Sequence, residues 1–304
     1  MEALRPMSTG ELLDRTISVY RRNFTLFLGI SVVTHAIYLG YQLLTMRSTP
    51  AVRGGARIGL SYYSTFLIGW VFLSFVLKIS EAATVKAVAA VYLEQPSSIW
   101  AAYGALRKRI FSVLGILLFI WLLFGLLSAL LILALVAIVA IFSVIWPGLP
   151  TSHVASLVLG ISVLVGCFAA FVAVYVRYAL AVQVCVVENL RFWASMKRSV
   201  FLSKGGRWRI ASVYLVFFVL SVMATFTSAW LGRMGGRLLH GWTAQAILVY
   251  VSTFIAGSIT APFATISLSL LYYDERVRKE AFDLHWMLST LQSPITPPFS
   301  EVQA

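Results

Sequence analysis

The stretch 110–146 contains no charged residue and no proline, and this feature limits the chain more than any other. Uncharged apolar runs longer than about 18 residues are typical of membrane-spanning helices. A soluble fold also needs a polar surface, yet 60% of the residues are hydrophobic and 12% are charged. Soluble domains have about 45–50% and 25%, respectively. The chain is therefore expected to be an integral membrane protein with one membrane domain.

Six apolar segments alternate with two kinds of connection, which are either short and rich in Gly and Pro or longer, basic and Trp-containing. The segments are 24–46, 58–93, 110–146, 152–187, 209–231 and 243–273. A turn inside hydrocarbon would leave backbone groups unsatisfied, so 110–146 is interpreted as one long helix. We predict an all-α integral membrane fold in which six transmembrane helices form three hairpins with interfacial amphipathic helices. The hairpins are 24–93, 110–187 and 209–273, and Gly235 and Gly236 are expected in a flexible outer turn.

Positive charge predicts the orientation of these helices. The chain has 24 Lys and Arg against 11 Asp and Glu, a net charge of +13. Most of the Lys and Arg lie in the two termini and in the connections 94–109 and 188–208. Lys and Arg accumulate on the cytoplasmic side of membrane proteins, so both termini and these two connections are expected in the cytoplasm. The amino terminus lacks the pattern of a cleaved signal peptide.

Two amphipathic helices are expected beside the membrane domain 24–273. Residues 1–23 form a cytoplasmic amphipathic helix, because Ser8 and Glu11 have the spacing of a capping box at its start. Residues 274–292 form a second one, and the Pro-rich residues 293–304 are expected to be a disordered tail. Both helices suit anchoring at the membrane surface, and docking of a protein partner is the alternative.

Three stretches resemble a known family. They are Leu4–Arg15 with Tyr20–Phe24, Val187–Asn189 with Lys197–Ser199, and Tyr272–Leu284. Together they resemble the bacterial glycerophosphoryl diester phosphodiesterase membrane-domain-like family. The resemblance implies a six-span module of unsettled function in the bacterial cytoplasmic (inner) membrane, sometimes fused to a soluble phosphodiesterase barrel. Because only about 30 residues follow the last span, we expect no barrel and hence no activity from the family label.

Catalytic signatures are absent from the sequence. It has no His-Glu-x-x-His, no Gly-x-Ser-x-Gly and no Gly-rich phosphate loop, and its four histidines are scattered. We therefore predict that the chain is not an enzyme, uses no cofactor or metal and binds no nucleic acid. Intramembrane lipid processing is the enzymatic alternative.

Ionisable residues inside the apolar segments are the strongest functional candidates, because such groups are costly in a membrane. They are His35, Lys78, Glu81, Lys86 and Arg177. The i,i+3 spacing of Lys78 and Glu81 allows them to pair along one helix face. The structural alternatives are that Lys78 and Arg177 extend to the interface and that His35 bonds to a Ser, Thr or carbonyl.

The connection 188–208 concentrates positive charge beside tryptophan and contains no acidic residue after Glu188. Basic residues bind the anionic leaflet, and Trp favours the membrane–water boundary. We predict contact with anionic membrane lipids through Arg191, Lys197, Arg198, Lys204, Arg207 and Trp208.

We expect a non-catalytic membrane module that organises lipids or partner proteins, and the alternative is a transporter of a small or amphipathic solute. A packed apolar centre favours the module. A polar cavity bounded by His35, Glu81 and the hydroxyl groups of residues 258–269 favours transport. The sequence leaves the substrate, the protein partner and the oligomeric state open.

Overall fold

The computed structural model describes residues 7–46, 60–92, 95–145, 153–238 and 242–280, and every regular element in these ranges is an α-helix. The helices are α1 (Thr9–Arg22), α2 (Phe24–Thr45), α3 (Leu60–Tyr92), α4 (Ile99–Ala105), α5 (Ile110–Ile145), α6 (His153–Tyr178), α7 (Ala181–Val187), α8 (Phe192–Ser203), α9 (Arg207–Leu238) and α10 (Trp242–Glu280). Within this part of the chain, six helices are long and apolar enough to cross a membrane. The chain thus has the architecture of a multi-pass helical membrane protein, as predicted.

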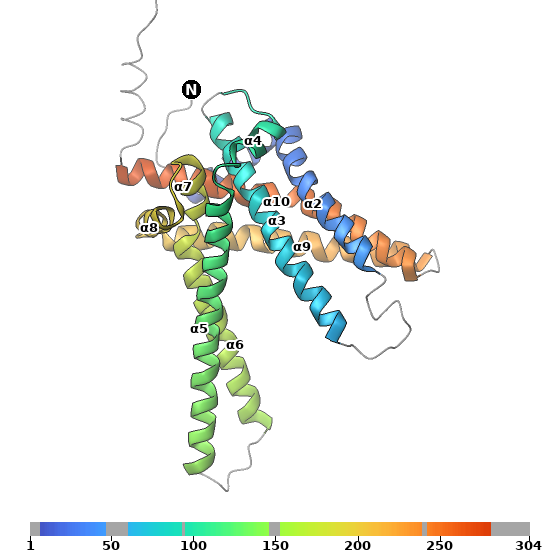
Figure 1. The fold of residues 1–304 in the computed structure, drawn as a ribbon, viewed down its shortest axis with the longest axis vertical. Helices are drawn as coiled ribbons and strands as arrows, with labels where there is room; N and C mark the ends of the chain where they lie inside the picture. The colour runs from blue at the N-terminus through green and yellow to red at the C-terminus, as the bar shows by residue number, and fades with distance from the viewer. Residues whose placement is uncertain (1–6, 47–59, 93–94, 146–152, 239–241, 281–304) are drawn as a thin grey trace, which may run out of the picture.

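The short helices gather at one end of the long ones (Figure 1). We call this end the hub: α1, α4, α7 and α8 with the adjoining ends of α3, α5, α9 and α10. Most of the buried apolar side chains belong to one cluster here, with Leu12, Ile116, Leu180, Leu202 and Ile266 fully buried. The molecule is therefore most tightly packed at the hub.

The long helices leave the hub in three directions (Figure 1). In each direction two helices contact each other, namely α2 with α3, α5 with α6, and α9 with α10. The tips at residues 47–59, 146–152 and 239–241 lie outside the described residues, so the three-hairpin connection remains a prediction. Away from the hub the long helices expose apolar side chains such as Leu133, Leu164 and Phe226.

The helix α1 begins as the sequence predicts. The Ser8 side chain accepts a hydrogen bond from the backbone N–H of Glu11, and the Glu11 side chain accepts one from the backbone of Ser8. Leu12, Thr16 and Tyr20 form its buried face, and Asn23 separates it from α2. The capping box and the amphipathic character of this segment are confirmed.

The helices differ from the expected segments in two places, although the segment 152–187 ends at Val187 as expected. The segment 152–187 is not one helix, because it breaks after Tyr178 and resumes as α7 at Ala181. At the break the carbonyl of Arg177 accepts hydrogen bonds from Ser199 and Ser203 of α8, so contacts from another helix satisfy this helix end. Conversely, no boundary lies at residue 274: α10 continues to Glu280, and residues 281–304 of the expected second amphipathic helix and tail lie outside the described residues.

The expected turn at Gly235 and Gly236 is instead part of α9. A Cβ atom on Gly236 would lie 2.4 Å from the Cα atom of Gln245, and one on Gly232 would lie 2.7 Å from the Cα atom of Val249. These two glycines are four residues apart and face α10, which is the small-residue pattern that brings transmembrane helices into backbone contact. Glycine serves close packing here rather than a turn.

Candidate functional site

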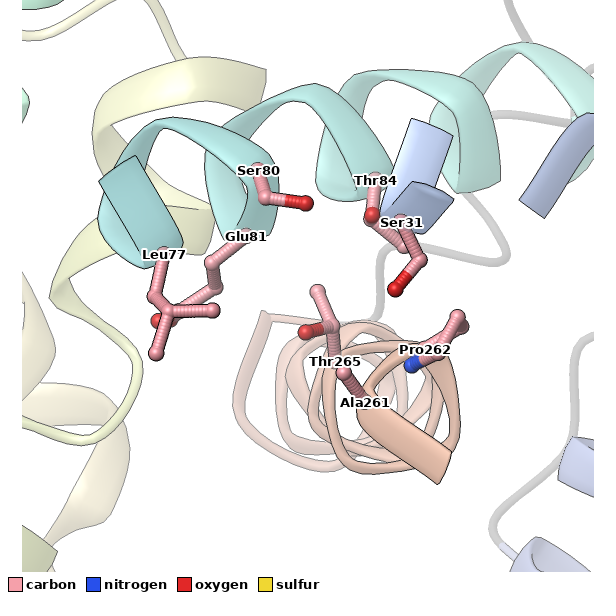
Figure 2. A pocket seen from close by; sticks show the side chains of 8 residues that line it. All are labelled: Ser31, Leu77, Ser80, Glu81, Thr84, Ala261, Pro262 and Thr265. Carbon is pink, nitrogen blue, oxygen red and sulfur yellow. The ribbon is translucent and has the colours of Figure 1, made fainter. Parts of the chain in front are cut away.

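A cavity of about 170 Å³ lies between α2, α3 and α10, next to the hub (Figure 2). It is lined by Ser31, Leu77, Ser80, Glu81, Thr84, Ala261, Pro262 and Thr265. The four residues from α3 follow the i, i+3, i+4, i+7 spacing of one helix face, so the sequence of α3 itself directs them to the same side. Figure 2 shows this face of α3 opposite α10, with Ser31 of α2 beside them.

Oxygen atoms supply the polar part of the cavity wall. They are the hydroxyl groups of Ser31, Ser80, Thr84 and Thr265 and the carboxylate of Glu81. The Ser80 hydroxyl also accepts a 3.2 Å hydrogen bond from Thr34, which is itself buried. The rest of the wall is apolar, and Leu77, Ala261 and Pro262 contribute to it. Polar groups at a cavity between membrane helices fit a solute-binding site better than a fully packed bundle.

Glu81 forms an ion pair on the side of the cavity. Its carboxylate lies 2.6 Å from the Lys78 ammonium group, and the two side chains are 18% and 11% exposed. Tyr175 of α6 and Tyr214 of α9, whose ring centroids are 4.8 Å apart, both lie near this pair. The predicted i,i+3 pairing is confirmed, and residues from all three pairs of long helices meet around it.

Pro262 adds a further polar feature to α10. Proline has no N–H, so the carbonyl of Ser258 four residues earlier loses its usual helical partner. The Ser258 hydroxyl is buried and has no hydrogen-bond partner among the described residues. The next carbonyl, that of Ile259, accepts a 3.1 Å hydrogen bond from Tyr20. This part of α10 therefore carries polar backbone and side-chain atoms that the helix does not satisfy.

His35 lies one helical turn from the cavity and does not line it. Its Nδ1 atom is 2.9 Å from the Ser31 carbonyl oxygen and 3.2 Å from the Ser31 hydroxyl. Its ring packs against α10 at Gly257, where an added Cβ atom would lie 2.8 Å away. His35 thus forms hydrogen bonds within its own helix and packs against α10. Of these contacts, only Ser31 lines the cavity.

The hydroxyl groups of α10 contribute less to the cavity than the sequence predicts. Thr265 is the one member of the 258–269 set that lines it. The hydroxyl groups of Thr260, Ser267 and Ser269 donate to carbonyls of their own helix. Such local bonds satisfy a hydroxyl group inside a membrane helix without any ligand.

Lys86 and Arg177 are the remaining intramembrane candidates, and neither lines the cavity. Lys86 is half-buried in the last part of α3, and Arg177 is exposed in the last turn of α6. The structure therefore brings Glu81 to the cavity and Lys78 to Glu81, and it places the other three candidates elsewhere.

The residues predicted to contact lipid lie on α8, directly next to its two ends and at the start of α9. Arg191, Lys197, Lys204, Arg207 and Trp208 are exposed. Arg198 differs because it points into the protein, where it pairs with Glu188 at 3.1 Å and Glu280 at 2.5 Å. Burial alone lowers the pKa of Arg198, but hydrogen bonds with Glu280 and Glu188 outweigh this effect and raise the pKa above its ordinary value. Arg198 is thus a structural residue rather than a free surface charge.

A buried ion network joins the end of α10 to α9 and to the amino-terminal segment. The Asp274 carboxylate accepts hydrogen bonds from the Met7 backbone N–H at 2.6 Å, from Arg209 and from Arg278. Both arginines also donate to the Met7 carbonyl oxygen, at 2.8 and 2.7 Å. Glu275 pairs with Lys279 at 3.0 Å and with Arg209 at 3.4 Å.

The i,i+4 spacing of Glu275 and Lys279 predicts their pair, but the sequence does not predict the network as a whole. One signal was available: Asp274 and Arg278, like Arg276 and Glu280, are spaced i,i+4. The partners Arg209 and Met7 are more than 60 residues away from Asp274 in sequence. Such contacts have no local signature.

Metal-binding chemistry has no support in the described ranges, which contain no group of three or more His, Cys, Asp and Glu side chains arranged to hold a metal ion. Cys167 and Cys185 are both free thiols. Comparison with protein-family models, curated proteins and solved structures finds no match to this chain.

Proposed function

We propose that this chain binds a small polar or positively charged solute in the cavity between α2, α3 and α10 and carries it across the membrane without chemical change. One observation supports this proposal above all. The Glu81 carboxylate and four hydroxyl groups line the same cavity within a bundle of apolar helices. Polar groups are costly in that environment, and they mark substrate or ion pathways in membrane proteins.

The charge of the site favours a cation or a donor-rich solute. The polar side-chain atoms of the wall are a carboxylate and hydroxyl groups. Oxygen ligands of this kind suit hard cations and ammonium groups. Lys78 is the internal counter-ion of Glu81 when no solute is bound. A solute cation that displaces Lys78 from Glu81 would couple binding to a movement of α3.

The proposal is tested by ligand-dependent stabilisation of the full chain in detergent. Sodium, potassium and methylammonium chloride are compared with choline chloride at constant ionic strength. A ligand present at 100 times its Kd stabilises the folded protein by about 2.7 kcal/mol, which is a clear rise in unfolding temperature. We expect stabilisation by at least one of the three smaller cations, and its loss in Glu81→Gln.

A matched pair of variants in α10 provides the control. Thr265→Val removes a hydroxyl group from the cavity wall, whereas Thr260→Val removes one that bonds within its own helix. The first variant should weaken the cation response and the second should retain it. If none of the three cations stabilises the protein, or if Glu81→Gln responds like the original chain, the solute proposal is wrong.

A second candidate is the non-catalytic module that organises lipids or partner proteins. Its support is that 11–33% of the residues in the six candidate spans are buried, so much of the apolar surface faces outward. Both proposals include a location in a bacterial inner membrane with cytoplasmic termini. Both also include membership of the phosphodiesterase membrane-domain-like family. Absence of any cation response together with full stability of the protein would favour the module.

A further inference from the structure

Four helices of the hub each carry an exposed aromatic side chain at their second residue. These residues are Trp100 of α4, Phe111 of α5, Trp193 of α8 and Trp208 of α9. Trp208 is 90% exposed, Phe111 is 86% exposed and Trp100 is 78% exposed. Large aromatic side chains this exposed on a tightly packed part of a protein mark an interaction surface.

Exposed cations accompany these aromatic residues. They are Arg107, Lys108, Arg191, Lys197, Lys204 and Arg207. The stretches 95–111 and 189–208 contain no acidic residue. Nearby carboxylates are already paired: Glu188 and Glu280 pair with Arg198, and Glu275 pairs with Lys279, so they do not offset this charge. We call these exposed residues at and between the ends of α4, α5, α8 and α9 the basic and aromatic surface of the hub.

We propose that this basic and aromatic surface binds the headgroups of anionic phospholipids. Its position in the fold favours lipid over a soluble polyanion. The helices α4 and α8 come directly before α5 and α9, whose apolar residues begin within one turn. Phe111 and Trp208 therefore stand at the start of two spans, and Trp100 and Trp193 lie on the short helices that precede these spans. Trp prefers that depth in a membrane, and each basic residue near an anionic surface contributes about 1 kcal/mol to binding.

The inference is independent of the cavity, because none of these residues lines it. Arg198 has a different role from the basic residues around it. Arg191, Lys197, Lys204 and Arg207 bind lipid, whereas Arg198 holds α8 to α7 and α10 through Glu188 and Glu280. A change at Arg198 therefore affects stability, and changes at the other four affect lipid retention.

The experiment compares two double variants of the full chain, each of which replaces two arginines by glutamine. Arg191→Gln with Arg207→Gln removes two exposed arginines from the surface, and Arg233→Gln with Arg237→Gln removes two from the far part of α9. Detergent-solubilised protein is titrated with phosphatidylglycerol and with phosphatidylcholine at two salt concentrations, and native mass spectrometry counts the bound lipids. We expect the first variant to bind phosphatidylglycerol roughly tenfold more weakly, with less dependence on salt. Phosphatidylcholine binding should be unchanged.

A third variant tests the aromatic part of the surface. Trp208→Ala should weaken phosphatidylglycerol retention. Trp230→Ala, which removes another exposed Trp farther along α9, should have a smaller effect. Equal losses in the two arginine variants would overturn the proposal, as would retention that is the same in all variants. Binding of a short RNA that depends on Arg191 and Arg207, while phosphatidylglycerol binding does not, would also overturn it.

Discussion

At the scale of single residues, Glu81 combines two contacts with different consequences. It pairs with Lys78 one turn earlier on α3, and it faces a cavity whose opposite wall contains Thr265 of α10. The first contact is local, and its spacing in the sequence predicted it. The second depends on how α10 lies against α3, and nothing in the residues around Glu81 reveals it.

Variants of this pair separate a structural role from a functional one. Lys78→Met and Glu81→Gln each leave a poorly solvated charge without its partner, so each should lower the free energy of unfolding by roughly 2–4 kcal/mol. The double variant should recover much of that loss, because an ion pair with little access to water contributes little net stability. Thermal unfolding of the three variants in detergent measures this.

Cation-dependent stabilisation of the same three variants gives the functional comparison. If Glu81 binds the solute, the double variant folds but does not respond to any of the cations. A double variant that recovers both stability and the cation response would contradict a role for Glu81 in solute binding. The pair would then be purely structural.

At the scale of helices, α9 and α10 depend on glycine for their contact. The Gly232 and Gly236 positions lie against the backbone of α10 at Val249 and Gln245. Gly235, one position away, meets only the Leu248 side chain, at 3.4 Å. Two adjacent glycines therefore have different environments in the same helix.

Alanine substitution should distinguish these two glycines. Gly236→Ala forces the helices apart, because its Cβ atom would overlap the Gln245 backbone, and we expect a loss of about 1–3 kcal/mol in unfolding free energy. Gly235→Ala gains up to about 1 kcal/mol of helix propensity without a backbone clash. Chemical denaturation in detergent provides the measurement. Equal effects of the two substitutions would show that the close contact between α9 and α10 is absent.

The last turn of α10 depends on the Asp274 network in a similar way. The Asp274 side chain is fully buried, and it accepts hydrogen bonds from Arg209, Arg278 and Met7. Asp274→Asn removes the carboxylate that Arg209 and Arg278 share and leaves Arg209 the longer carboxylate contact with Glu275, which should cost about 3–5 kcal/mol. Asp14→Asn, at an exposed position of α1, should change stability by no more than about 0.5 kcal/mol. A small effect at Asp274, measured by the same denaturation, would mean that this network does not hold α9 to α10.

At the scale of the whole molecule, the hub is the most tightly packed part and the long helices extend from it. Its core joins helices from every region of the described chain, and the ion pairs at Glu188 and Asp274 tie α7, α8, α9 and α10 together. The basic residues of α8 belong to this hub, so the proposed orientation places the hub at the cytoplasmic face.

Cysteine labelling tests that orientation with two positions flanking one helix. Lys204, just before α9, and Arg237, near its end, are both exposed. In a background lacking Cys167 and Cys185, Arg237→Cys should react with a membrane-impermeant reagent added to intact cells. Lys204→Cys should react only after the cells are lysed. The reverse pattern would invert the topology and the location of the basic surface.

The sequence alone determined that this protein lies in a membrane and that it has six long apolar helices. Uncharged runs such as 110–146 leave a membrane as the only environment in which they are stable, and the described part of the chain has six helices long and apolar enough to cross it. Local spacing also predicted the Ser8–Glu11 capping box and the Lys78–Glu81 pair, because these interactions join residues within one helical turn.

Only the tertiary structure decided which polar groups face one another. The partners of Arg198 come from other helices, so no local pattern distinguished the part-buried Arg198 from the exposed Lys197 next to it. The same holds for the α6–α7 break and for the helical Gly236, where contacts from α8 and α10 override the local signals of an apolar run and a Gly pair. In an apolar chain, hydrophobicity is nearly uniform and carries no information about neighbours. The placement of the few polar and small residues is therefore fixed by packing and hydrogen bonding between helices.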